Sequence, residues 1–283
     1  MIRILTDSAS DILPAEAAQL GVDVIPLNVT LEDGTVIRDG VDLTPSEYYE
    51  HMAGCKKLPT TSQPSPELFQ RFFLEAAAAG DEVVGIFLSH ELSGTCQCAR
   101  LAADMANVDN VLFVDSENVC LGESLLVRLA VQLRDAGKTA GQIAATLEHA
   151  KEHLHLVAVI DDLKYLRRGG RISAAAQVAG SLLKIKPILQ SDPEGHIIQH
   201  SKVRGQLKAM ETLAELYKEY AVDGTRTVGI AHADCPDGAL RLQAKLRDAG
   251  QTGEILSVCY EPVTGGHVGP GTVALFFFGE IWR

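Results

Sequence analysis

The sequence is short of positive charge and lacks any long apolar run. With 25 Lys and Arg against 37 Asp and Glu, the formal net charge is −12. Proteins that bind nucleic acids present a basic surface, so this balance argues against a nucleic-acid partner. Apolar stretches such as residues 273–278 are far shorter than the ~18 residues that a membrane-spanning helix needs.

Cysteine is also sparse, and the six cysteines match no familiar site. Cys96 and Cys98 are separated by one residue and have no second pair, which does not fit the spacing of a structural zinc site. Residues 1–7 turn polar too early for a secretory signal. We therefore expect reduced thiols, no disulfide framework and a cytoplasmic protein.

Two sequence patterns bear on cofactors and metals. The glycine-rich motifs G-x-G-x-x-G and G-x-x-x-x-G-K-[ST] are absent, so the usual cradle for a nucleotide is missing and we expect no cofactor. His149 and His153 fit the H-x-x-E-H pattern of inverted zinc proteases. Because such a site also needs another carboxylate ligand and a cleft, we interpret residues 149–153 as a solvated helix face and expect no metal.

The 283 residues are 46% hydrophobic and 22% charged, which is typical of a packed globular protein. In the first half, short β-rich runs alternate with helical patterns, which predicts a mostly parallel sheet with flanking helices. The second half has a turn at 192–195 between two strand patterns, and it predicts an α/β domain with a mostly antiparallel sheet. We place the boundary at residue 157, which gives domains 1–157 and 158–283 with net charges of −13 and +1.

The helical and β-rich patterns define the expected elements. Predicted strands are residues 2–5, 22–26, 83–88, 111–114, 156–160, 186–190, 196–201, 227–231, 255–260 and 272–278. Predicted helices are residues 66–79, 90–107, 119–136, 140–153, 205–220 and 237–248.

Three hydroxyl-rich turns stand at predicted strand ends or helix starts. They are Thr6-Asp7-Ser8, Thr60-Thr61-Ser62 and Ser93-Gly94-Thr95. Hydroxyl and backbone N–H groups at the carboxyl end of a parallel strand suit an anion. Helix capping explains each turn taken singly, but the three together indicate a binding site.

Glycines surround two further polar residues. His267 lies among four glycines in the run 264–271, and glycines let the backbone approach a ligand closely, so we favour a functional role for His267. Arg171 follows Gly169 and Gly170, which fix its direction. The basic cluster around it contains Lys164, Arg167, Arg168, Lys184 and Lys186. A short helix that ends at Gly169 also explains Arg167 and Arg168, through their interaction with its dipole.

In their order along the chain, these motifs resemble the DegV family. The matching segments are Thr6-Asp7-Ser8 with Asp11, 59–66, 92–95 with Gln97, Asp115-Ser116, Tyr165-Leu166 with 169–172, 186–189, and Gly266-His267 with 269–271. The resemblance implies two α/β domains with a long-chain fatty acid buried between them. It also implies a non-catalytic carrier that presents the acid to a separate, dihydroxyacetone-kinase-like fatty acid kinase, which makes the acyl phosphate for phospholipid metabolism.

The resemblance also assigns roles to individual residues. Thr61, Ser93 and His267 would hold the carboxylate, with Gly94 and Thr95 adding an N–H group and a hydroxyl. Supporting residues would be Ser62, Arg171, Arg204 and Gly266. This chain departs from the family's usual residues at His90, Cys98, Glu261 and Thr264, which bears on pocket shape and partner recognition.

Two other functions stay open at this stage. Ser93 and His267 would suit the nucleophile and base of a lipid or ester hydrolase, and the same turns would suit a binder of another small anion. The basic cluster would serve as a docking surface for the kinase, or for brief contact with a membrane.

Overall fold

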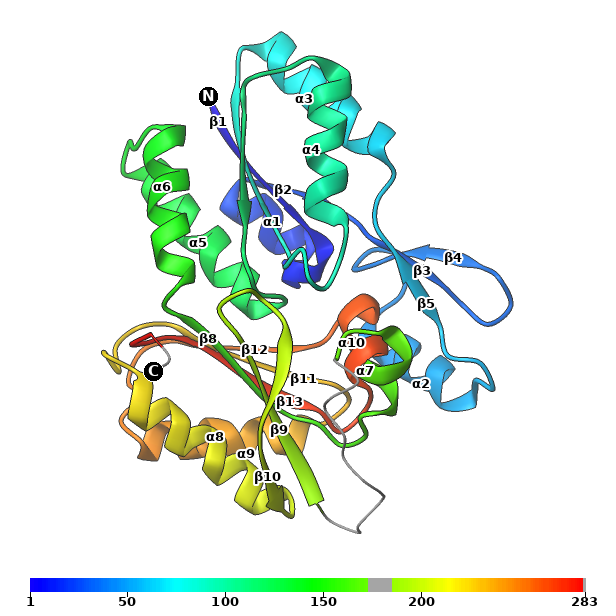
Figure 1. Cartoon of the computed structure of the whole chain (residues 1–283), viewed down its shortest axis with the longest axis vertical. Coiled ribbons are helices and arrows are strands. Elements are labelled where there is room, and N and C mark those ends of the chain that lie inside the picture. Colours follow the sequence, from blue (N-terminus) through cyan, green and yellow to red (C-terminus); the bar gives the residue numbers. More distant parts are fainter. Residues whose placement is uncertain (173–184, 282–283) are drawn as a thin grey trace.

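The computed structural model describes residues 1–172 and 185–281. Figure 1 shows most of the N-terminal elements, coloured blue to green, above the C-terminal elements, coloured green to red, with part of the blue segment beside the C-terminal elements. Helices cover the apolar faces of both sheets, as an α/β chain requires. Within the described ranges, no helix is both long and apolar enough to span a membrane.

The N-terminal sheet is fully parallel, with strand order β2-β1-β6-β7, which confirms the predicted mostly parallel sheet. Its strands are near-continuous apolar runs because helices cover both faces. The strands are β1 (Ile2–Asp7), β2 (Val22–Ile25), β6 (Glu82–Phe87) and β7 (Val111–Asp115). The helices are α1 (Pro14–Leu20), α3 (Pro66–Ala79), α4 (Thr95–Ala106), α5 (Leu121–Asp135) and α6 (Ala140–Lys151), with a 3-10 turn η1 (Ser8–Ser10).

A small antiparallel sheet, ordered β4-β3-β5, projects from this part of the chain. It comprises β3 (Asn28–Thr30), β4 (Val36–Arg38) and β5 (Thr60–Ser62), and helix α2 (Pro45–Gly54) lies between β4 and β5 in sequence. Short strands with few buried side chains carry a weak sequence signal, and β5 was not among the predicted strands.

The C-terminal sheet has the order β10-β9-β8-β13-β11-β12, and only the β11–β12 pair is parallel. The predicted mostly antiparallel sheet is therefore confirmed. The boundary at residue 157 falls inside β8, and the division into domains stays a prediction. The elements are β8 (Leu154–Val159), α7 (Lys164–Gly169), β9 (Ile185–Ser191), β10 (Ile197–Arg204), α8 (Gln206–Tyr220), β11 (Val228–His232), α9 (Pro236–Asp248), β12 (Ile255–Cys259), α10 (Pro262–Val268) and β13 (Val273–Phe278).

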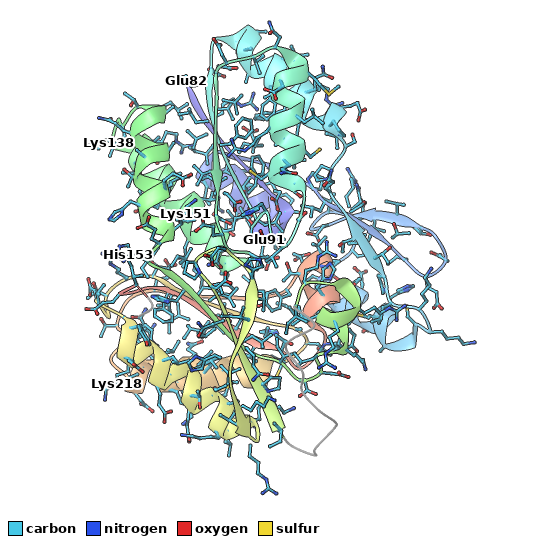
Figure 2. All side chains as sticks on the ribbon, viewed as in Figure 1. Glu82, Glu91, Lys138, Lys151, His153 and Lys218 are labelled. Carbon is cyan, nitrogen blue, oxygen red and sulfur yellow. The ribbon has the colours of Figure 1, made fainter. Side chains whose placement is uncertain are left out.

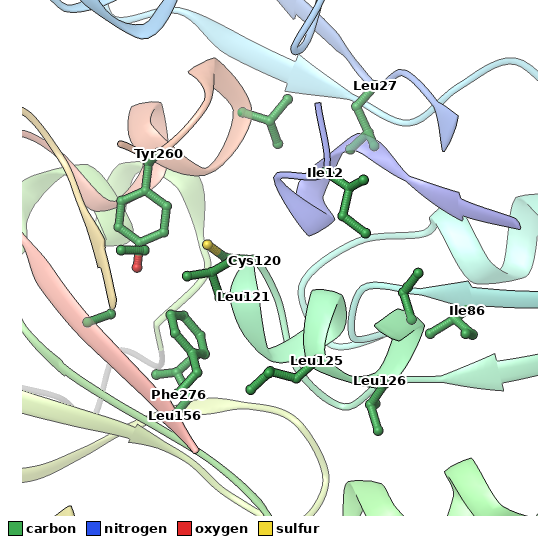
Figure 3. Packing of buried hydrophobic residues seen from close by; sticks show 14 of the residues in the cluster. Ile12, Leu27, Ile86, Cys120, Leu121, Leu125, Leu126, Leu156, Tyr260 and Phe276 are labelled. Atoms are coloured by element: carbon green, nitrogen blue, oxygen red, sulfur yellow. The ribbon is translucent and has the colours of Figure 1, made fainter. Parts of the chain in front are cut away.

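The two sheets share one hydrophobic core through α5. The largest buried cluster combines N-terminal residues such as Leu121 with C-terminal residues such as Phe276 and Leu156. Figure 3 shows Cys120 and Leu121, at the start of α5, close to Tyr260 and Phe276. A Cβ at Gly229 of β11 would lie 2.6 Å from the Leu121 Cβ, so α5 packs directly on the second sheet. This shared core fixes the two halves relative to each other.

The β9–β10 hairpin adds a polar contact between the halves. Its turn reaches the segment before α4, where Ser89 Oγ donates to the Gly195 carbonyl at 3.0 Å. His196 Nε2 lies 3.0 Å from Glu91 Oε2, and Glu91 is placed at this junction in Figure 2. The hairpin therefore closes over the end of the N-terminal sheet where β6 finishes.

Candidate ligand-binding site

A partly open pocket, which we call the cavity, lies between elements of both halves. Most of its described lining is apolar. Leu156, Ala158 and Ile160 project into it because alternate residues of a strand share one face. Leu189 and Ile197 of the β9–β10 hairpin also line it, as does Leu27 from the N-terminal half. A largely apolar wall with a few polar groups is typical of a site for a small apolar ligand.

Strand β5 brings Thr61 to this cavity. Thr61 pairs with Val29 of β3, and strand alternation turns the Thr61 side chain inward while Thr60 and Ser62 are exposed. Thr61 Oγ1 lies 2.8 Å from Nε2 of His267. Two residues that are 206 positions apart in sequence thus form one polar pair on the cavity wall.

His267 lies on a short helix, α10, within the glycine-rich run. Pro262 at the first turn has the fixed φ that a helix start accepts. The imidazole sits against the end of α7, where a Cβ at Gly169 would lie 2.3 Å from His267 Nδ1. Gly169 therefore permits an approach between α7 and α10 that any larger residue would prevent.

The His267 imidazole is neutral at physiological pH. Burial, with the positive charge of Arg171 as a second cause, lowers the pKa of His267 to about 4. A neutral imidazole has one donor and one acceptor nitrogen. The Thr61–His267 pair is therefore an uncharged pair that offers hydrogen bonds, rather than a full positive charge, to a ligand.

The turn that follows β6 contributes Ser93. Helix α4 begins at Thr95 and not at the predicted residue 90, because Leu92 and Ser93 donate their N–H groups to the Ser89 carbonyl in a preceding turn. Ser93 Oγ lies 2.9 Å from the hydroxyl of the buried Thr95. Ser93 lines the cavity beside the N-terminus of α4, where the helix dipole favours negative charge.

Arg171 links this turn to α7 and α10. Its Nε donates to the Leu92 carbonyl at 2.9 Å, and its Nη1 donates to the Gly169 carbonyl. Gly169 lies against His267, and on the other side a Cβ at Gly94 would lie 2.3 Å from Gln63 Oε1. Thr61, Gln63, Ser93, Arg171 and His267 thus lie near one another in the lining, connected by these contacts and by the intervening backbone, and we call these five residues the polar ring.

Of the other site residues expected from the sequence, Ser62 lies in the cavity wall, and Gly94, Thr95, Gly266 and Arg204 lie outside it. Thr95 is buried behind Ser93, and Gly94 packs against Gln63. Gly266 packs against Tyr48, whose hydroxyl oxygen would lie 2.5 Å from a Cβ added at Gly266. Ser62 does line the cavity, whereas Arg204 is exposed at the end of β10, outside the described lining.

The geometry of Ser93 and His267 does not match a hydrolase. The Ser93 hydroxyl pairs with Thr95, and His267 Nε2 pairs with Thr61. A nucleophile and its general base must be hydrogen-bonded to each other, with a third group orienting the base. In the described part of the chain, His267 Nδ1 faces Gly169 rather than a carboxylate.

The sequence did not predict two polar residues of the cavity lining, and it predicted one turn to be part of the site that lies elsewhere. Gln63 and Thr264 line the cavity beside predicted residues; the adjacent hydroxyls and histidine were the signals that pointed to those segments. The Thr6-Asp7-Ser8 turn is fully buried and lines no part of the cavity. Within the basic cluster, Lys164 pairs with Asp162 and Lys186 with Asp161, while Lys184 lies outside the described residues.

The H-x-x-E-H segment forms the end of α6 and the turn after it. His149 and His153 pack edge to face, and His149 lies 3.6 Å from Glu152. Among the described residues, the only group of His, Cys, Asp or Glu close enough to share a metal ion is Asp192, Glu194 and His196, in the β9–β10 turn.

Comparisons with known proteins identify the family. The family model described as "Uncharacterised protein, DegV family" matches residues 1–280. A DegV domain-containing protein of Halalkalibacterium halodurans is 36% identical over 281 residues, which is 99% of each chain. Another, of Deinococcus radiodurans, is 36% identical over 283 residues, or 97% of each chain.

Solved structures with similar sequences have the same fold. One is a DegV family protein from Thermus thermophilus whose description refers to fatty acid binding. Its structure matches this chain with a TM-score of 0.91 and 32% sequence identity, and the match covers 98% of this chain and 99% of that one. DegV from Bacillus subtilis, described as a fatty acid binding protein, has a TM-score of 0.87 and 31% identity, covering 99% of each chain. The chain belongs to the DegV family.

Proposed function

We propose that this chain binds one long-chain fatty acid, with the carboxylate held by Thr61, Ser93 and His267 and the hydrocarbon chain in the apolar cavity. The observation that carries the proposal is the polar ring on the wall of a cavity that is otherwise mostly apolar. The similar proteins from Thermus thermophilus and Bacillus subtilis, described as binding fatty acids, support it.

The proposed binding divides between the acyl chain and the headgroup. At ~0.8 kcal/mol for each buried CH₂ group, a long acyl chain gains on the order of 10 kcal/mol in gross transfer free energy. Ordering the ligand offsets part of this gain. The carboxylate would accept hydrogen bonds from the polar ring, close to the N-terminus of α4, so that its negative charge is buried with partners. In this account the hydrocarbon supplies affinity and the polar ring selects an acid.

The finer part of the proposal concerns what happens to the bound acid. Gln63 of the polar ring is exposed, as are Ser62 and Gly94 beside it, which would leave the carboxylate within reach of a second protein. That protein would be a dihydroxyacetone-kinase-like fatty acid kinase in the cytoplasm, which converts the acid to its acyl phosphate. This chain would itself carry no catalytic group or cofactor, and a brief contact with a membrane would load it.

Native mass spectrometry tests the binding. Protein offered a mixture of fatty acids and matched fatty alcohols should gain the mass of one acid per chain and little alcohol. No acyl adduct, or equal uptake of acids and alcohols, would contradict the proposal.

Presentation is tested separately with a fatty acid kinase and ATP. The loaded protein should yield acyl phosphate only when the kinase is present. If the kinase phosphorylates acid on another DegV protein but not on this one, then presentation is wrong while binding stands.

A further inference from the structure

Helix α10 lies in the C-terminal half of the sequence, but two carboxyl groups from the N-terminal half hold its start. The Val263 N–H donates to Asp39 Oδ1 at 2.8 Å. The Glu261 N–H lies 3.4 Å from Asp11 Oδ1 in a longer contact. Backbone N–H groups in the first turn of a helix have no partner within the helix. Asp39 and Asp11 therefore accept hydrogen bonds that α10 cannot satisfy by itself.

The opposite side of α10 is held by two tyrosines of α2. A Cβ at Gly265 would lie 2.2 Å from the Tyr49 hydroxyl oxygen, and one at Gly266 would lie 2.5 Å from that of Tyr48. The Tyr49 hydroxyl also donates to the Tyr260 carbonyl at 3.3 Å. The tyrosine side chains therefore pack closely against the glycines of α10, while Asp39 and Asp11 accept hydrogen bonds from its first turn.

Both carboxyl groups have a second, N-terminal partner. Ser8 Oγ donates to Asp39 Oδ2 at 2.7 Å, and the Cys120 thiol donates to Asp11 Oδ2 at 2.6 Å. Asp39 is 1% exposed and Asp11 is 4% exposed. Each carboxyl group thus joins the end of β1 or the start of α5 to the first turn of α10. The buried Thr6-Asp7-Ser8 turn, which lines no cavity, supplies one end of this link.

Burying a carboxyl group without a positively charged partner costs stability, which argues that Asp39 and Asp11 have a role beyond packing. Burial raises the pKa of Asp39 to about 7 and raises the pKa of Asp11 well above its ordinary value. The titratable groups that interact with one or both of them are Asp7, Tyr48, Tyr49, Cys120, Glu123, Cys259, Tyr260 and Glu261.

We propose that Asp39, assisted by Asp11, is a positioning residue for the headgroup site: by holding the first turn of α10 it sets where the His267 imidazole meets Thr61 and the ligand carboxylate. The inference rests on the proposed fatty-acid binding. It assigns to Asp39 a role that neither the cavity lining nor the sequence motifs indicate. It also predicts that a defect at Asp39 acts on the acid group of the ligand and spares the hydrocarbon chain.

The first test compares palmitic acid with its alcohol, hexadecanol. Asp39→Leu leaves the Val263 N–H without its acceptor, so acid affinity should fall about tenfold or more, while alcohol affinity should change less than about twofold. Asp39→Asn keeps an acceptor oxygen for Val263 and should retain acid affinity. The control for general destabilisation is Phe73→Leu, on the buried face of α3 and away from the cavity. This variant should not change the ratio of the two affinities. If the ratio of palmitic acid affinity to hexadecanol affinity is the same in Asp39→Leu as in wild type, the proposal is wrong.

A second test needs no ligand and separates this inference from the proposed function. In protein with ¹⁵N-labelled histidine, the His267 signal, identified by its loss in His267→Gln, is followed between about pH 6 and 8, where Asp39 titrates. We expect the wild-type signal to shift through this range by clearly more than the Asp39→Asn signal, in which the other buried carboxyl groups, Asp7 and Glu261, still titrate. Identical behaviour of the two proteins would overturn the positioning role, whether or not either protein binds fatty acid.

Discussion

In the proposed site, His267 is the residue on which the headgroup chemistry would depend, and its lowered pKa makes it uncharged at neutral pH. Its imidazole is enclosed by Thr61, the end of α7 and the positive Arg171. A protonated imidazole would pair more strongly with a carboxylate, but burying it without a ligand would be costly. A neutral imidazole beside a hydroxyl lets the site exist empty and still offer hydrogen bonds to an acid.

The lowered pKa of His267 makes a prediction about stability. Because its pKa is about 4 in the folded protein and about 6.5 when unfolded, the unfolded chain binds the extra proton first as the pH falls. The stabilisation by neutral His267 is therefore present above about pH 6.5 and is lost toward pH 4, by up to about 3 kcal/mol. The melting temperature of wild type relative to His267→Gln should fall between about pH 7 and 4.5. A constant difference would show that His267 is not buried as a neutral group.

Ser93 permits a direct test of the polar ring. Ser93→Ala removes one donor to the carboxylate, so affinity for palmitic acid should fall about tenfold while affinity for hexadecanol stays nearly constant. Isothermal titration calorimetry measures both affinities. The matched control is Ser65→Ala, at an exposed position that makes no side-chain cap to α3. An unchanged acid affinity in Ser93→Ala would remove Ser93 from the site.

Local sequence patterns pointed to Thr61, Ser93 and His267 because hydroxyls at helix starts and a histidine among glycines are visible without the fold. Asp39 and Tyr48 were not recognised, because nothing in their own segments distinguishes a buried residue from a solvated one. Their burial depends on the packing of α2 and α10, which are more than 200 residues apart in the sequence. Residues that support a site from another part of the chain are the ones that local reasoning loses.

Among the secondary-structure elements, α10 is the one in which tertiary contacts overcame a low local helix propensity. Glycine is a poor helix former, and no helix was predicted over the run 264–271, whose glycines were interpreted as letting the backbone approach a ligand. The structure forms a helix over Pro262–Val268 because its glycines admit the two tyrosines of α2 and its first turn is held from outside. The predicted strands of both sheets, by contrast, were visible because their apolar runs are continuous.

The contact between α7 and α10 gives a prediction at this scale. Gly169→Ala places a methyl group 2.3 Å from His267 Nδ1, and it should displace the imidazole from Thr61 and lower acid affinity about tenfold or more. Gly54→Ala is a matched control, since Gly54 is also the last residue of a helix and has no neighbour within 4 Å of its added Cβ. Fatty acid titration of both variants measures the effect. Equal affinities would show that the close approach of α7 has no role in the site.

The whole molecule is organised around the junction of its two halves, which holds the cavity, the shared core and a set of buried carboxyl groups. Burial is the largest cause of the raised pKa values of Asp7 and Asp39, to about 7, and of Glu261, to about 8. Some of the carboxyl groups that give the first half its net charge of −13 in the sequence are therefore buried in the interior. Composition revealed the charge but not its location, because only the packed fold shows which carboxyl groups lose their water.

These carboxyl groups predict that the protein loses stability as the pH rises. A folded-state pKa above the ordinary value means that the folded protein holds the proton to higher pH than the unfolded chain does, so stability falls between about pH 4 and 7 as Asp39 ionises. Asp39→Asn cannot ionise, so its melting temperature relative to wild type should rise from about pH 5 to 8, by the equivalent of at most about 4 kcal/mol. Differential scanning calorimetry at both pH values measures the change. A relative stability that falls over this range would contradict the burial of Asp39 as described.

In the proposed complex, a fatty acid lies in the cavity with its carboxylate at the polar ring. A crystal structure of the protein with palmitic acid tests this most directly. We predict carboxylate oxygens within ~3.2 Å of the side chains of Ser93 and of the Thr61–His267 pair, and an acyl chain that runs along Leu156, Ala158 and Ile160 of β8. An acid bound with its carboxylate away from these residues, or outside this cavity, would contradict the account.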